Sequence, residues 1–248
     1  VLPTLTLPTY DRTSCYLDTA VKVKAAIAEL QARVNNRTLK FVGLDAEWVA
    51  GQPMSYGVDT LQISTTAADD ASLISILIPR ALLVKPLKEL VNFLKDSGVA
   101  KVGRHIGPDV KRLAAFNLVV GNVVDIGRRA KELKLVTRVN VTLDSLVRLI
   151  LKKTLVGKGA TQVSKWDAHM LTDEQVTYAL VDAYASARVY EELLVKEDAE
   201  KTPSRMALTK GSEVRLYNLG NRRLAAIALV FMADGEFEGD PIKDDDVV

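Results

Sequence analysis

The chain has 248 residues, of which 48% are hydrophobic and 26% are charged, proportions that are typical of a globular protein and exclude wholesale disorder. Its one cysteine, Cys15, excludes an internal disulfide, argues against a zinc cluster and fits a reducing compartment. No apolar run approaches the ~18 residues of a membrane-spanning helix, so we expect a soluble, intracellular protein without a membrane segment. The first residue is Val1 rather than methionine, which leaves open a removed targeting segment and the choice between nucleus, cytoplasm and organelle.

The formal net charge of +2 is unevenly distributed along the chain. Residues 234–248 hold seven acids and one lysine, a charge of −6, which leaves +8 on residues 1–233. A body of that charge can attract a polyanion such as nucleic acid, although scattered surface lysines are the commoner reason for a modest positive charge. We expect the acidic end to be disordered.

Helical and strand patterns follow one another along most of the chain. Residues 17–36 carry apolar side chains at helical spacing and end in Asn35-Asn36, which predicts a helix. A short apolar run before Asp45 predicts a buried strand, and the β-rich stretches 58–65 and 72–79 predict its antiparallel partners. Helices and strands then alternate: helix 85–98, strand 100–105, helix 108–117, strand 122–127, and helices at about 126–134, 142–152 and 172–197. This order predicts an α/β fold, with a mixed sheet flanked by helices on both faces.

A different pattern begins at Pro203. Residues 212–231 predict two strands around a turn at 218–221, which would form a small C-terminal β element. We therefore expect three parts: a domain with an N-terminal helix over residues 1–200, the β element over 203–233, and the acidic tail over 234–248.

Two acids, Asp45 and Glu47, end the first predicted strand, in KFVGLDAEWVA (40–50). Alternate residues of a strand point to the same face, so the two carboxylates should lie side by side. Like charges at that distance repel, and burying a carboxylate without a partner costs on the order of several kcal/mol. A divalent metal ion between them would remove this cost. On these residues alone, a hydrated strand end without a ligand is an equally good interpretation.

Further along the chain, Asp109 and Asp182 lie in predicted helices. Asp109 falls in the first turn of helix 108–117, where the helix dipole by itself favours an acid. Asp182 follows Tyr178 by four residues, so the two side chains share a helical face. Ala, Leu and Val surround them in the sequence, and an acid in such a buried helix needs a partner.

These acids fall in three segments, GLDAEW, VGRHIGPDVKRL and LTDEQVTYALVDAYAS, and SKWD (164–167) precedes the third. In order and spacing they resemble the motifs of the DEDD superfamily of 3′–5′ exonucleases, in the tyrosine branch that includes ribonuclease D and the Werner-syndrome-type exonuclease domains. The resemblance covers about residues 15–197 and implies a ribonuclease-H-like fold. Tyr178 stands four positions before Asp182, as in that branch, whereas the position of the histidine branch, five before, holds Thr177. The second motif, with RHIGPD, is more basic and more rigid than the family pattern.

The resemblance implies four carboxylate ligands for two Mg²⁺ or Mn²⁺ ions, which prefer oxygen donors: Asp45, Glu47, Asp109 and Asp182. Asp45 would bridge the ions, Glu47 and Asp182 would hold the ion that activates water, and Asp109 would reach the other ion through water. Tyr178 would orient the attacking water, because a phenol with an ordinary pKa of ~10 is a poor base at neutral pH. The implied reaction is hydrolysis of phosphodiester bonds from the 3′ end of DNA or RNA, which releases nucleoside 5′-monophosphates.

The sequence also contains candidate substrate contacts. Trp48, Leu61 and Gln62 could line the pocket of the terminal nucleotide, since aromatic and apolar side chains contact bases without reading their sequence, but Trp48 fits a core equally well. Arg104 or His105 could touch phosphate, or lie at an ordinary solvated strand end. Two alternatives to catalysis stay open: a non-catalytic nucleic-acid-binding relative, and a scaffold whose C-terminal β element binds a partner protein or a second copy.

Overall fold

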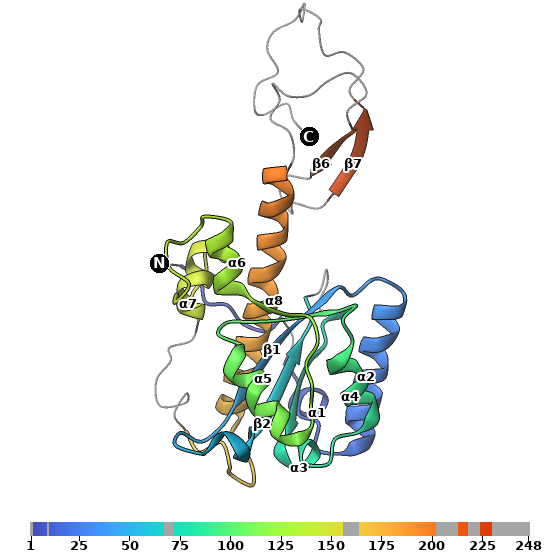
Figure 1. The fold of residues 1–248 in the computed structure, drawn as a ribbon, viewed down its shortest axis with the longest axis vertical. Coiled ribbons are helices and arrows are strands. Elements are labelled where there is room, and N and C mark those ends of the chain that lie inside the picture. Colours follow the sequence, from blue (N-terminus) through green and yellow to red (C-terminus); the bar gives the residue numbers. More distant parts are fainter. Residues whose placement is uncertain are drawn as a thin grey trace, which may run out of the picture. The chain divides into compact units, whose positions relative to one another are not determined.

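The computed structural model describes residues 2–8, 10–66, 72–155, 164–201, 213–217 and 224–229 (Figure 1). The chain divides into two compact units, Val1–Leu193 and Leu194–Val248. Within the described ranges, no helix is both long enough and apolar enough to cross a membrane.

The first unit is built on a mixed five-stranded sheet, which confirms the predicted fold class. Strand β1 pairs with β2 in antiparallel and with β4 in parallel orientation, and the full order is β3-β2-β1-β4-β5. The strands are β1 (Phe41–Glu47), β2 (Thr60–Ser64), β3 (Ser75–Pro79), β4 (Ala100–Gly103) and β5 (Val123–Asp125). β2 and β3 lie within the predicted stretches 58–65 and 72–79. β2 is the antiparallel partner of β1, as predicted, whereas β3 pairs with β2 and not with β1. β1 is the central strand, so its side chains point toward helices on both faces of the sheet.

The helical elements comprise the predicted stretches, with two differences near their ends, and three short elements at 12–15, 54–56 and 80–83 that the sequence did not predict. They are α1 (Arg12–Cys15), α2 (Ala20–Asn35), the 3₁₀ turn η1 (Met54–Tyr56), α3 (Arg80–Leu83), α4 (Lys88–Lys95), α5 (Gly107–Leu113), the 3₁₀ turn η3 (Ala114–Phe116), α6 (Ile126–Glu132), α7 (Leu143–Leu146), the π-helical turn η4 (Val147–Leu151) and α8 (Asp173–Lys201). The helix expected over 108–117 becomes a 3₁₀ turn after Leu113 and ends at Asn117, whose φ of 59° is left-handed. The helix expected over 142–152 changes to π geometry and ends at Lys152, with φ at 55°. A left-handed residue cannot continue a right-handed helix.

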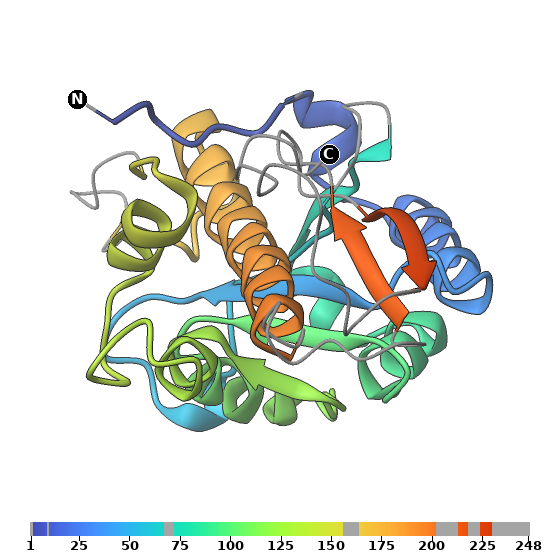
Figure 2. The same cartoon turned by 90° about the horizontal axis from the view of Figure 1, so that it is seen from above.

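Helices α2 and α4 cover one face of the sheet, and α8 covers the other (Figures 1 and 2). Alternation along β1 explains the division, because the odd and even residues of a strand point to opposite faces. The even residues of β1 join the hydrophobic cluster beneath α2 and α4, which includes Val42, Leu44, Ala46, Ile27, Leu30 and Phe93. The odd residues, which include Asp45 and Glu47, point toward α8.

The second unit contains an antiparallel pair of strands, β6 (Glu213–Tyr217) and β7 (Leu224–Leu229). Both strands fall in the region predicted to form a β element. The predicted turn at 218–221 and the acidic tail at 234–248 lie outside the described residues.

Candidate functional site

Three carboxylates from β1 and α8 converge at one point. α8 approaches β1 very closely at Gly43: a Cβ added there would lie 1.9 Å from the backbone oxygen of Ala183. Only glycine permits this approach, and it brings Asp182, the neighbour of Ala183, against the end of β1. Carboxylate oxygens of Asp45, Glu47 and Asp182 consequently lie within 4.8 Å of one another. The side-by-side arrangement expected for Asp45 and Glu47 is present, and a third acid joins it.

The fourth acid, Asp109, lines the same cavity of about 650 Å³ as these three carboxylates, although it is not a member of the close group. It lies in the first turn of α5, as predicted, and is only 6% exposed, so it is a buried acid rather than a surface one. Burial raises the pKa of Asp109 well above its usual value of 3.8, and the nearby charge of Asp45 raises it further. Arg112 acts in the opposite direction and lowers that pKa. The cavity therefore disfavours a fourth negative charge unless a cation is present.

Tyr178 lines this cavity one helical turn before Asp182. Its ring packs against the buried Trp166 of the SKWD segment, with centroids 6.2 Å apart. Burial raises the pKa of the Tyr178 hydroxyl above its ordinary value, and the charges of Asp182, Glu47 and Asp45 and a hydrogen bond with Asp182 add to the effect. The phenol therefore stays neutral at physiological pH, so it can orient a neighbouring group but is a poor general base.

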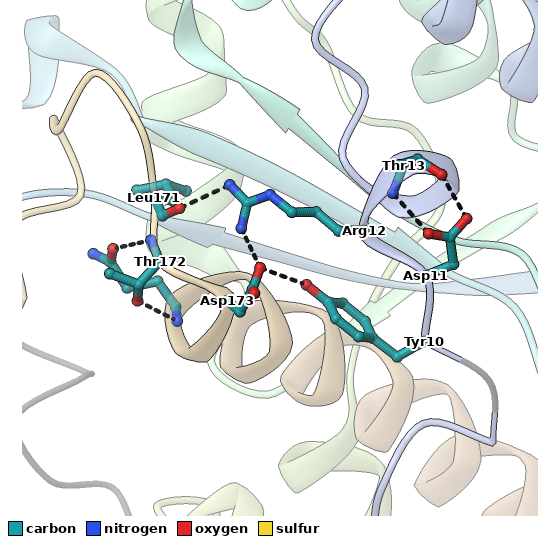
Figure 3. Close-up of polar contacts among 8 residues, drawn as sticks. Tyr10, Asp11, Arg12, Thr13, Leu171, Thr172 and Asp173 are labelled. Carbon is teal, nitrogen blue, oxygen red and sulfur yellow. Dashed lines mark hydrogen bonds and ion pairs between the residues drawn. The ribbon is translucent and has the colours of Figure 1, made fainter.

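The N-terminal segment anchors the start of α8 (Figure 3). Arg12 donates hydrogen bonds to the Leu171 carbonyl oxygen at 2.7 Å and to Asp173 Oδ1 at 2.5 Å, and the Tyr10 hydroxyl donates to Asp173 at 3.4 Å. Thr172 and Gln175 form a reciprocal capping box, in which each backbone N–H donates to the side-chain oxygen of the other residue. The spacing Thr-x-x-Gln is a sequence signal for this cap, whereas nothing in the sequence pairs Arg12 with Asp173.

Two of the five predicted substrate contacts do not reach the cavity. Leu61 pairs in register with Ala46 and is fully buried in the core beneath α2 and α4, on the sheet face opposite Asp45. Gln62 pairs with Asp45 and shares its face, but it too is fully buried. Its Nε2 donates to Thr60 Oγ1 at 2.5 Å, and its Oε1 has no hydrogen-bond partner within the described part of the chain. Neither residue is placed to contact a nucleotide.

The other three predicted contacts, Trp48, Arg104 and His105, line the cavity. Trp48 is half-buried beneath the guanidinium of Arg112, which lies 4.4 Å from its ring centroid. Arg104 donates to the Val141 carbonyl oxygen and lies 3.7 Å from an oxygen of Asp125. His105 is exposed, and its backbone N–H donates to Asp125 at 2.7 Å. With φ at 58°, His105 adopts a left-handed conformation at the rim of the cavity.

A family model described as 3′–5′ exonuclease matches residues 16–197 of the chain. The chain belongs to this family. The match spans both β1 and α8, the two elements that supply the three-carboxylate group, and it confirms the resemblance to the DEDD exonucleases. The predicted tyrosine branch is compatible with this assignment.

Two curated relatives are 29% and 25% identical to this chain over the residues that align with it. It is 29% identical to mouse exonuclease 3′-5′ domain-containing protein 2 over 158 residues, which are 62% of this chain and 24% of the mouse protein. It is 25% identical to a 3′-5′ exonuclease of Arabidopsis thaliana over 196 residues, 77% of this chain and 64% of that protein. The chain thus spans a quarter of the mouse relative and just under two thirds of the plant one.

Solved structures show the same fold. The Nibbler EXO domain of Aedes aegypti aligns with a TM-score of 0.61 at 19% identity, covering 80% of this chain and 94% of that domain. Escherichia coli RNase D aligns with a TM-score of 0.59 at 19% identity, covering 77% of this chain and 46% of that protein. The ribonuclease-H-like exonuclease fold implied by the sequence motifs is therefore confirmed.

Proposed function

We propose that this protein is a metal-dependent 3′–5′ exonuclease of the tyrosine branch, which hydrolyses DNA or RNA from the 3′ end and releases nucleoside 5′-monophosphates. The observation that carries the proposal is the convergence of Asp45, Glu47 and Asp182 within 4.8 Å of one another. Asp109 and Tyr178 line the same cavity, so the four acids and the tyrosine of the sequence motifs all line one cavity. Membership of a 3′–5′ exonuclease family supports degradation from the 3′ end.

The donor set fits Mg²⁺ or Mn²⁺, because these ions take oxygen ligands and the group offers only carboxylates. Without a cation, three acids at this separation repel one another. The pKa of Asp109 is raised first by burial and further by the charge of Asp45. We propose that Asp45, Glu47 and Asp182 hold two ions together with Asp109. When bound, such a pair would activate water and stabilise the attacking and leaving oxygens of an in-line displacement.

The protein's own side chains would place the reacting groups. The neutral Tyr178 hydroxyl, hydrogen-bonded to Asp182, would position the attacking water without removing its proton. Its packing against Trp166 holds the phenol in place. Trp48 offers an apolar wall for the terminal base, since aromatic contact with a base is tolerant of sequence.

Labelled single-stranded DNA and RNA, incubated with Mg²⁺, with Mn²⁺ and with EDTA, test the proposal. A label at the 3′ end should be released first as a mononucleotide, and EDTA should abolish its release. Asp182→Asn should lower the rate by about 10²-fold or more, because it alters a ligand and displaces the attacking group.

Glu174→Gln provides the control, because it neutralises an exposed acid on the same helix. It should retain the wild-type rate. Release of the 5′ label first would overturn the polarity, and full activity in Asp182→Asn would overturn the site.

A further inference from the structure

A second hollow, of about 630 Å³, adjoins the acid cavity. The two spaces share four lining residues: Arg104, His105, Pro108 and Asn140. The second hollow extends from this shared wall along α5, β5 and α6. A polymer whose terminal unit occupies the acid cavity could therefore continue past the shared residues into this hollow.

The charge of the second hollow is opposite to that of the acid cavity. Four of its lining residues are cationic, Arg104, Lys111, Arg128 and Arg129, and we refer to these four as the basic groove. Two acids, Asp125 and Glu132, also line the hollow, so its formal charge is +2 with His105 neutral.

Two of the four cations are held by the acids, and two are not. Arg129 pairs with Glu132 at 2.8 Å, and Arg104 lies 3.7 Å from Asp125. Lys111 and Arg128 are exposed and form no ion pair with any described residue. Their charges are therefore available to an external anion.

Backbone N–H groups donate hydrogen bonds to Asp125, so this carboxylate competes less strongly with an external anion for the cations of the groove. The carboxylate accepts hydrogen bonds from the backbone of His105 at 2.7 Å, Gly127 at 2.9 Å and Arg128 at 3.0 Å. These donors stabilise its negative charge within the fold. Asp125 thus serves to hold the β4–α5 and β5–α6 junctions together, and the groove keeps an excess of positive charge.

Another hollow, of about 540 Å³, is less suitable for a nucleic-acid strand. It shares no lining residue with the acid cavity, and its charged side chains sum to −1: Arg12 and Arg80 against Asp18, Asp59 and Asp167. Both arginines are already engaged. Arg12 binds Asp173, and Arg80 donates to the carbonyl oxygens of Tyr56 and Val58 at 2.6 and 3.0 Å.

We propose that the basic groove binds the phosphates of the strand on the 5′ side of the terminal nucleotide, with Lys111 and Arg128 as the principal contacts. The proposal rests on the exonuclease function, because it assumes a 3′ end in the acid cavity. None of the described residues that line the second hollow is Phe, Tyr or Trp, so bases cannot stack on an aromatic side chain there. The groove therefore favours a phosphate backbone of several nucleotides, independently of base sequence.

The test compares a thymidine dinucleotide with oligothymidylates of increasing length up to a dodecamer, on wild-type protein and on Lys111→Ala/Arg128→Ala. The dinucleotide fills the acid cavity without reaching far along the groove. The ratio of variant to wild-type KM should therefore grow with length, to about tenfold for the dodecamer. The plot of log affinity against log salt should become less steep by about 1.4, since each lost phosphate contact on a single strand contributes about 0.7.

Two control variants isolate the charge effect. Lys88→Ala removes an exposed cation from α4 that does not line the second hollow, and should leave the length dependence at the wild-type level. Lys111→Arg/Arg128→Lys keeps both charges and should retain most of the dodecamer affinity. Thermal melting of every variant verifies that the fold is intact.

Anisotropy of a fluorescent dodecamer in EDTA separates the two proposals, because binding is then measured without hydrolysis. If wild-type protein binds the dodecamer in EDTA and Lys111→Ala/Arg128→Ala loses that affinity, while neither protein cleaves it when Mg²⁺ or Mn²⁺ is supplied, the groove stands and the exonuclease function fails. If wild-type protein cleaves and the alanine variant has the same dodecamer affinity and salt slope, the groove proposal is overturned. Equal KM ratios for dinucleotide and dodecamer overturn it as well.

Discussion

Replacing Gly43 with alanine should separate the two elements that carry the candidate metal ligands. The added methyl would lie 1.9 Å from the Ala183 carbonyl oxygen, 2.9 Å from its carbon and 3.0 Å from the Ala187 nitrogen. All three are backbone atoms of α8, so no side-chain rotation can make room. An ordinary contact of about 3.4 Å requires α8 to move from β1 by roughly 1.5 Å at this point. Asp182 and Tyr178 lie on the part of the helix that must move.

A displacement of that size should reduce turnover strongly, because a misplacement of about 1 Å can lower a rate by roughly 10²-fold. The strain should also destabilise the fold by about 1–3 kcal/mol, the usual cost of overpacking a core. For a protein of this size that corresponds to a fall in Tm of roughly 2–4 °C per kcal/mol. The assay is release of a 3′ label at saturating Mg²⁺, together with thermal melting in the presence and absence of the ion.

Gly98→Ala is the matched control. The nearest atom to a methyl at Gly98 is Asp96 Oδ1, at 3.1 Å, and this carboxylate end can shift by a few tenths of an ångström. The control should keep the wild-type rate. If Gly43→Ala retained both rate and Tm, the close approach of α8 would not be what assembles the site.

Two further predictions address the chemistry of the cavity. Tyr178→Phe preserves the ring packed against Trp166 and removes a hydroxyl that is not a ligand, so Mn²⁺ affinity by isothermal titration should stay close to wild type while turnover falls about 10²-fold. Equal loss of Mn²⁺ binding in Tyr178→Phe and Asp182→Asn, or a wild-type rate in Tyr178→Phe, would contradict the positioning role. The second prediction concerns Asp109. Burial raises the pKa of this carboxyl group above 3.8. In EDTA, its ionisation should therefore destabilise the fold increasingly as the pH rises from 3.8 through the folded-state pKa. Asp109→Asn lacks this titration, and its Tm in EDTA should exceed the wild-type Tm by a margin that grows as the pH rises above about 4. A margin independent of pH would show that Asp109 carries no such penalty.

Features that depend on local periodicity could be predicted from the sequence. The two-residue repeat of a strand places Asp45 and Glu47 on one face, and the spacing of a helix places Tyr178 one turn before Asp182. The strands β2 and β3 were predicted at the correct places because each is bounded by turn-forming or polar residues, although only β2 pairs with β1. In each case the side chain's direction is set within a few residues of the backbone.

The register between strands decided which residues reach the site. Leu61 and Gln62 are adjacent, so they point to opposite faces of the sheet and could not both face a nucleotide. Pairing of Gln62 with Asp45 and of Leu61 with Ala46 assigns Leu61 to the core. This register depends on contact between two strands, which the pattern of either strand alone does not contain.

Packing between distant segments decided the remaining features of the protein. Asp109 looked like an ordinary acid in the first turn of a helix, and only the folding of α5 against the acid cavity makes it buried. Arg12 and Asp173 bind across a sequence separation of 161 residues. Lys111 and Arg128 belong to different helices and line one groove only because the parallel strands β4 and β5 bring the starts of those helices to the same end of the sheet. The sequence therefore determined the chemical groups and their local directions, whereas the tertiary structure determined burial, proximity and charge balance, because these arise from contacts that no local pattern encodes.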